Sequence, residues 1–200
     1  MSSHLSRFLF GIALFCNGCG LILGGTAGVK QYYVLNVPEV TAVASQKRPY
    51  SIFLADIDCP SYICGKRIVY SREEGTRGFY QYAFWAEPLG SRLKVLFAQF
   101  LRLSGLFQDV SQENVPTGDF RIVSIRVADF YFDTTKEGSV AVGIFEYSLS
   151  GVSADGSVSR GSFERRVEVE GRDLEGIVRG FQKLLDQLSG DLITFLIDAK

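Results

Sequence analysis

Histidine is almost absent from this chain of 200 residues, which contains only His4. Histidine is the commonest general base at neutral pH, a member of the usual serine and cysteine triads, and the commonest metal ligand. A hydrolase would therefore depend on carboxylates such as Asp56 or Glu87, and no pair of acids in the chain has a recognisable motif around it. We expect a protein that is not an enzyme and that holds no metal.

A strong charge of either sign is missing as well. The chain has 21 Lys and Arg residues against 22 Asp and Glu residues, for a formal net charge of −1. Proteins that bind nucleic acid usually carry an excess of basic residues to neutralise phosphates, so we expect no nucleic-acid partner. The apolar fraction of 46% is that of an ordinary globular domain with a real core.

Cysteine is scarce, and its four positions form two groups. Cys16 and Cys19 lie near the start, whereas Cys59 and Cys64 are separated by four residues. A zinc site would need two further ligands, and a redox motif normally has two residues between its cysteines. In an oxidising compartment Cys59 and Cys64 could form a structural disulfide, and two free thiols are the alternative.

The first residues have the pattern of a secretory leader. A basic start that ends at Arg7 is followed by an apolar stretch over 8–15, and Gly18 stands directly before Cys19. Bacterial lipoprotein signals end in a small residue before the cysteine that becomes the lipidated N-terminus. We therefore predict a signal peptide over 1–18, a lipid on Cys19 as the only attached group, and a tether over 19–28. An uncleaved anchor is the alternative, because residues 8–29 carry no charge and about 20 apolar residues can span a bilayer.

The residue after Cys19 bears on the choice of membrane. Gly20 is not the Asp that retains bacterial lipoproteins at the inner membrane. We expect the protein on the periplasmic side of the outer membrane, with an inner-membrane anchor as the alternative. The diacylglyceryl group of a lipoprotein supplies the two acyl chains that firm anchoring needs.

Hydrophobic periodicity predicts alternating strands and helices in the rest of the chain. Strands are expected at 29–37, 50–57, 67–71, 78–84, 120–133, 140–149 and 160–170, with a hairpin at 67–84, a turn at 59–66 and a bulge between Val127 and Phe130. Pro88 begins a helix that ends near 104–105, and Asp173 caps a helix of about 22 residues. This order predicts one α+β domain over 29–200, in which two long helices pack on one face of a mixed or antiparallel sheet.

Four aromatic residues are candidates for partner contacts. Tyr32 and Tyr33 are adjacent in a predicted strand and point to opposite faces, so only one of them can enter the core. Tyr62 lies in the predicted turn and is the best candidate for an exposed contact, because aromatic residues are enriched at interfaces. Trp85 is better explained as a packing anchor at the start of a helix than as a contact residue.

Three short motifs resemble those of a known family. They are Tyr-Tyr-Val-Leu at 32–35, Ile-Val-Tyr-Ser-Arg at 68–72 and Trp-Ala-Glu-Pro-Leu at 85–89. In this order and behind a lipoprotein signal, they resemble the ABC-type transport auxiliary lipoproteins, the family that includes paraquat-inducible protein C. The chain departs from the family pattern at Ile63, where Leu is usual, in the cysteines on either side of Tyr62, and at Cys16 and Asn17 of the lipobox.

The resemblance implies a role that composition alone does not. It implies an accessory subunit of an ABC transport system of the mammalian-cell-entry type, with lipid or other hydrophobic cargo and a part in envelope integrity. The implied partners are mammalian-cell-entry-domain and ABC permease subunits, and further copies of the chain in a ring. A freestanding lipoprotein that binds a lipid between sheet and helices, or assists envelope assembly, is the alternative.

Overall fold

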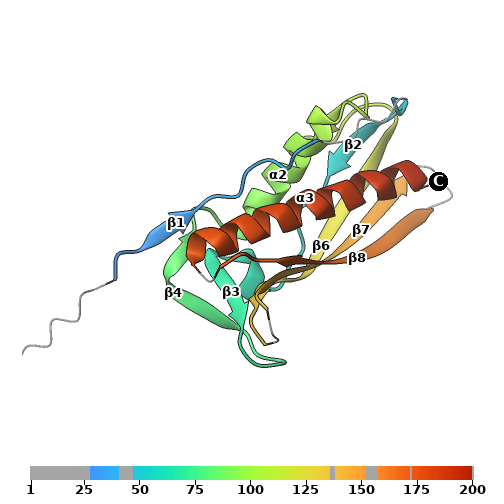
Figure 1. Ribbon diagram of the computed structural model, residues 1–200. Coiled ribbons are helices and arrows are strands. Elements are labelled where there is room, and N and C mark those ends of the chain that lie inside the picture. Colours follow the sequence, from blue (N-terminus) through green and yellow to red (C-terminus); the bar gives the residue numbers. More distant parts are fainter. Residues whose placement is uncertain (1–27, 41–46, 136–137, 152–156, 172, 200) are drawn as a thin grey trace, which may run out of the picture.

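The computed structural model describes residues 28–40, 47–135, 138–151, 157–171 and 173–199. The predicted signal peptide at 1–18, Cys19 and the tether up to residue 27 lie outside these residues. The elements are β1 (Gln31–Tyr33), β2 (Ser51–Leu54), α1 (Ser61–Cys64), β3 (Arg67–Ser71), β4 (Gly78–Trp85), α2 (Leu89–Leu103), β5 (Val110–Ser111), β6 (Phe120–Asp133), β7 (Val140–Gly151), β8 (Val158–Glu168) and α3 (Leu174–Asp198) (Figure 1).

The longest strand, β6, organises one mixed sheet. Its first residues pair in parallel with β2, and its last two residues pair in parallel with β3. Its other edge pairs antiparallel with β7 along almost the whole strand, and β8 follows β7. β4 and β1 extend the sheet beyond β3, and β5 extends it beyond β2. The predicted mixed sheet of an α+β fold is confirmed.

A bulge in β6 keeps its apolar residues on the core face. The register against β7 shifts between Val127 and Asp129, as the change in sequence pattern predicted. Before the bulge the odd-numbered Val123, Ile125 and Val127 belong to the main core, and after it the even-numbered Phe130 and Phe132 do. One extra residue therefore corrects the alternation that an unbroken strand would impose.

Both long helices cover the same face of the sheet, as predicted (Figure 1). The ring of Phe97 from α2 lies 6.1 Å from the ring of Phe145 in β7. The ring of Phe181 from α3 stacks on Phe130 at 4.7 Å, and Phe130 in turn meets Phe145. These side chains fill the space between the layers. None of the helices in the described residues combines the length and apolarity that a membrane span requires.

The structure differs from the sequence-based expectation in its short elements. Residues 59–66, predicted as a turn, contain the one-turn helix α1, and the two-residue strand β5 was not predicted. Elements this short give no readable periodicity. The first two strands, expected at 29–37 and 50–57, are shortened to β1 and β2. Asp173 occupies the N-cap position of α3, but its side chain makes no capping hydrogen bond.

Candidate interaction surface

β1 forms one end of the sheet and carries the first candidate residues. It pairs in parallel with β4, which sets Tyr32 opposite Phe84 and Tyr33 opposite Trp85. Tyr32 is 59% exposed, and its ring lies 5.8 Å from that of Phe84. The side chain of Tyr33 is half-buried against the core. Of the two adjacent tyrosines, Tyr32 is therefore the one that a partner can reach.

α1 presents the third candidate, Tyr62, at the surface. The helix begins after Pro60, and a disulfide joins Cys59 to Cys64 across it, with the two Cα atoms 5.7 Å apart. Of the two alternatives that the sequence left open, the structure therefore has the disulfide. Ile63 is buried beneath the helix, whereas Tyr62 is 36% exposed. The disulfide and the burial of Ile63 thus fix α1 in an orientation that leaves Tyr62 at the surface.

Gly90 in the first turn of α2 allows that helix to approach the disulfide. A Cβ atom at this position would lie 3.0 Å from the sulfur of Cys64 and 3.4 Å from that of Cys59. Any larger side chain would push α2 away from α1, which is fixed by the disulfide. The start of α2 and the position of Tyr62 are coupled in this way.

Tyr32 and Tyr62, thirty positions apart in sequence, line the same surface hollow of about 500 Å³. We call it the aromatic–basic hollow and define it by three cations and four aromatic residues: Lys30, Lys66, Arg67, Tyr32, Tyr62, Phe79 and Phe84. The ammonium of Lys30 lies 5.9 Å from the centre of the Phe84 ring, and the guanidinium of Arg67 lies 4.9 Å from that of Phe79. No carboxylate lines the hollow among the residues that the structure describes. Its chemistry suits a partner that is anionic and partly apolar.

An ion pair next to the hollow affects Tyr62. Arg77 and Asp129 form a hydrogen-bonded ion pair, and the guanidinium of Arg77 lies 3.8 Å from the ring centre of Tyr131. Burial raises the pKa of Tyr62, Asp129 raises it further, and Arg77 lowers it. The phenol of Tyr62 therefore stays protonated at neutral pH and is available as a hydrogen-bond donor.

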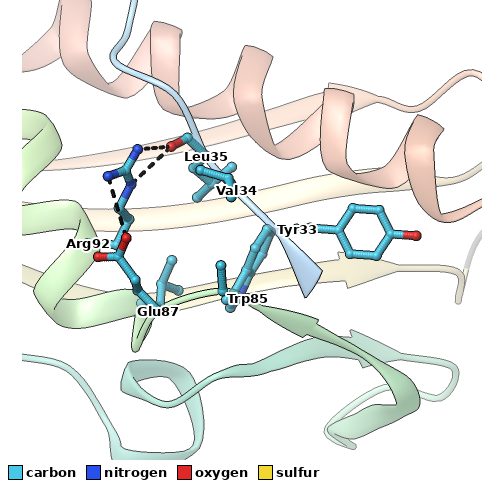
Figure 2. A pocket seen from close by; sticks show the side chains of 8 residues that line it. Tyr33, Val34, Leu35, Trp85, Glu87 and Arg92 are labelled. Atoms are coloured by element: carbon cyan, nitrogen blue, oxygen red, sulfur yellow. Dashed lines mark hydrogen bonds and ion pairs between the residues drawn. The ribbon is translucent and has the colours of Figure 1, made fainter. Parts of the chain in front are cut away.

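Trp85 is not a surface residue. It is 3% exposed, and its ring meets the edge of Phe181 at 5.5 Å, so no partner can reach its ring. The cleft between Trp85, Tyr33 and Arg92 has a volume of only about 10 Å³, which is at most the space of one water (Figure 2). The packing role of Trp85 is thus the one that its surroundings support, and its proposed role as a partner contact is wrong.

Hydrogen bonds from the two long helices hold the chain after β1 against the body of the domain. Arg92 of α2 donates two hydrogen bonds to the carbonyl oxygen of Leu35, at 3.0 and 2.7 Å (Figure 2). Its guanidinium also lies 3.8 Å from the carboxylate of Glu87, which pairs with Arg92 rather than capping the helix. The backbone N–H of Asn36 donates to the side chain of Gln182 in α3 at 2.8 Å. These contacts form a latch, defined by Leu35, Asn36, Arg92 and Gln182.

A second, polar groove lies on the face of the sheet opposite the helices. It has a volume of about 440 Å³ and is lined by side chains of β6, β7, β8 and the segment after β2. Arg126 lies between two acids in this groove, 3.5 Å from Asp58 and 3.9 Å from Glu146. The acids therefore neutralise the cation, unlike the situation in the aromatic–basic hollow.

Neither surface was predicted in full from the sequence. Tyr32 and Tyr62 were predicted, but Lys30, Arg67 and Phe79 were not. Lys30 lies two positions before Tyr32 and Arg67 lies five positions after Tyr62, and these spacings give no readable signal in the sequence. Within the described residues no group of His, Cys, Asp and Glu side chains could hold a metal ion.

Comparison with known proteins identifies relatives of the chain. The model of the family described as the ABC-type transport auxiliary lipoprotein component matches residues 33–192. No curated protein sequence matches the chain. The crystal structure of a Xanthomonas campestris protein of the family DUF330 is 19% identical, covers 82% of this chain and 92% of its own, and has a TM-score of 0.72. A second crystal structure, of an uncharacterized protein, is 17% identical, covers 82% and 97%, and has a TM-score of 0.67. At these identities the likeness shows a shared fold.

Proposed function

The chain belongs to the family of ABC-type transport auxiliary lipoprotein components, and from this membership we propose that it is a lipid-anchored periplasmic accessory subunit of an ABC transport system of the mammalian-cell-entry type. The observation that carries the proposal is the match over residues 33–192, which runs from the end of β1 into α3. The family is one of transport auxiliary lipoproteins and not of enzymes. We further propose that the cargo is a lipid or another hydrophobic compound and that the subunit supports envelope integrity.

The anchor in this proposal is a lipid on Cys19 after removal of residues 1–18. Gly20 in the next position supports the outer membrane as the destination. The two acyl chains of a diacylglyceryl group bind a bilayer firmly, whereas a single chain binds only marginally. The domain would thus stay on one membrane while its partners approach from the periplasm.

The partners in this proposal are a mammalian-cell-entry-domain tunnel protein, a permease and further copies of the chain in a ring. The polar groove around Arg126 suits a protein partner, since its alternating charges can fix the register of a complementary surface. The alternative of a freestanding lipid carrier with a cavity between the layers has less support. The rings of Phe97, Phe130, Phe145 and Phe181 occupy that space.

Intact-mass analysis of the protein extracted from its native envelope tests the anchor. We expect the mass of the chain from Cys19 plus diacylglyceryl and acyl groups, and loss of these groups in a Cys19→Ala variant. A Cys16→Ala variant is the matched control and should keep the lipid. An unmodified full-length mass for the wild type would contradict the lipid anchor.

Co-purification tests the transport role separately. After mild crosslinking, the lipidated protein should bring down a tunnel or permease subunit in stoichiometric amounts. A protein that is lipidated but is recovered alone, with an extractable lipid bound to it, would instead support the freestanding carrier.

A further inference from the structure

We propose that the aromatic–basic hollow rests on the anionic phospholipid headgroups of the membrane to which the protein is anchored, and so orients the domain. This inference rests on the lipid anchor of the proposed function. It concerns a surface that neither the family match nor the fold assigns. The occupant we propose is the bilayer surface itself.

The charge of the hollow is the first argument. Lys30, Lys66 and Arg67 are exposed, and within the described residues none of them pairs with a carboxylate. The ammonium of Lys66 donates to the backbone carbonyl oxygen of Ala86, at 3.0 Å, which leaves its charge unneutralised. Elsewhere on the protein several cations are neutralised, as Lys94 is by Asp56 at 2.6 Å and Arg165 is by Asp191 at 2.5 Å. A protein with a net charge of −1 thus places three cations that no carboxylate neutralises around one hollow. Such a cluster attracts phosphate groups on an anionic bilayer.

The aromatic residues of the hollow are the second argument. Tyr32 and Tyr62 are both exposed at its rim, and each combines an apolar ring with a polar hydroxyl. Tyrosine is enriched where membrane and water meet, because one end of its side chain suits each environment. A soluble anion such as free phosphate would use the cations alone. A headgroup region with its adjoining acyl carbons would use the cations and the rings together.

The position of the hollow is the third argument. β1, drawn in blue in Figure 1, carries Tyr32 and lies at the end of the domain where the chain enters it. Nine residue steps separate Cys19 from Gly28, and at about 3.5 Å for each extended step they span at most ~32 Å. The lipid anchor therefore keeps this end near the bilayer. Contact between hollow and headgroups becomes an intramolecular step, so even weak sites are occupied.

Covalent footprinting of lysines on vesicles tests the inference with the whole lipidated protein. The protein is reconstituted into vesicles of phosphatidylcholine with about 30% phosphatidylglycerol, or of phosphatidylcholine alone, and labelled with an amine-reactive acetylating reagent. We expect labelling of Lys30 and Lys66 to fall at least about threefold on the anionic vesicles, relative to Lys183 on the exposed side of α3. Salt at about 0.5 M should reverse the protection, because it screens exposed charges.

A double substitution, Lys66→Gln with Arg67→Gln, provides the matched variant. It should remove the protection of Lys30, measured against Lys183, on anionic vesicles, whereas Arg179→Gln, which removes an exposed cation of α3, should not. Thermal unfolding of each variant checks that the fold is retained. The wild-type measurement does not depend on either variant.

Two failures can be told apart. A protein that floats with the vesicles and carries the lipid mass, but whose Lys30 and Lys66 react as fast as Lys183, overturns the orientation and leaves the proposed function standing. The hollow would then be free for an acidic protein partner. A protein that neither floats nor carries the lipid mass overturns both.

Discussion

At the scale of single residues, the buried hydroxyl of Tyr147 is the polar group whose removal should be most informative. Tyr147 is 1% exposed, and its hydroxyl donates a hydrogen bond to the carbonyl oxygen of Leu188 in α3 at 2.8 Å. This bond links the sheet to the helix through the core. We expect Tyr147→Phe to lower the free energy of unfolding by about 1 kcal/mol, because a buried acceptor loses a partner. Urea unfolding measures this, and the exposed Tyr82→Phe is the control, expected to change little.

The same residue has a signature in alkaline solution. Burial holds the pKa of Tyr147 well above its usual value of 10.0, Asp191 raises it further, and Arg165 lowers it. Above about pH 10 the unfolded chain loses this proton while the folded protein keeps it, so stability falls as the pH rises. Tyr147→Phe should therefore show a smaller loss of stability between about pH 10 and 11 than the wild type. If the free energy of unfolding fell equally steeply with pH in the wild type and in Tyr147→Phe, this account would be contradicted.

At the scale of elements, a glycine in α3 lies close against Val169, the residue directly after β8. A Cβ atom at Gly180 would lie 2.4 Å from Cγ2 of Val169, whose branched side chain can rotate little. We expect Gly180→Ala to destabilise the protein by about 1–3 kcal/mol, because the helix must move away from the core. Gly190→Ala in the same helix is the matched control. Nothing lies within 4 Å of its Cβ position, so the better helix propensity of alanine should raise stability by about 0.5–1 kcal/mol. Equal effects of both changes would contradict this packing.

The elements that the sequence predicts well are those with many residues of one period. β6, β7, α2 and α3 each repeat their pattern over several turns or strand pairs, and even the bulge near Ala128 follows from the change of parity. The pairing of β2 and β3 with successive parts of one edge of β6 could not be predicted. That arrangement depends on contacts between distant segments, and each segment contributes only a few residues to it.

At the scale of the whole molecule, the aromatic–basic hollow also depends on contacts between segments that are distant in the sequence. Tyr32 could be chosen from the sequence because it belongs to a Tyr-Tyr pair in a predicted strand, and Tyr62 because it lies in a predicted turn. Their meeting in one hollow depends on the parallel pairing of β1 with β4 and on the disulfide across α1. Lys30 and Arg67 become a pair of neighbouring cations only through that arrangement. No local pattern in the sequence encodes it.

The connection between anchor and domain is also a property of the whole molecule. If the chain carries the proposed lipid, any pull on it would enter the described domain through the three residues of β1 and reach α2 and α3 through the latch. We expect Arg92→Ala to accelerate amide hydrogen exchange in residues 33–36 by about tenfold, because hydrogen bonds from a charged group contribute about 1.5 kcal/mol. Exchange in β6 and β7 should stay the same, since they lie in the centre of the sheet.

Arg126→Ala is the control for this change. Arg126 also pairs with carboxylates, but it does so on the open face of the sheet, far in the chain from β1. It should leave exchange in residues 33–36 unchanged. If Arg92→Ala also leaves it unchanged, the pairing of β1 with β4 alone holds the chain. The load from the anchor would then reach the sheet first and the helices only through the core.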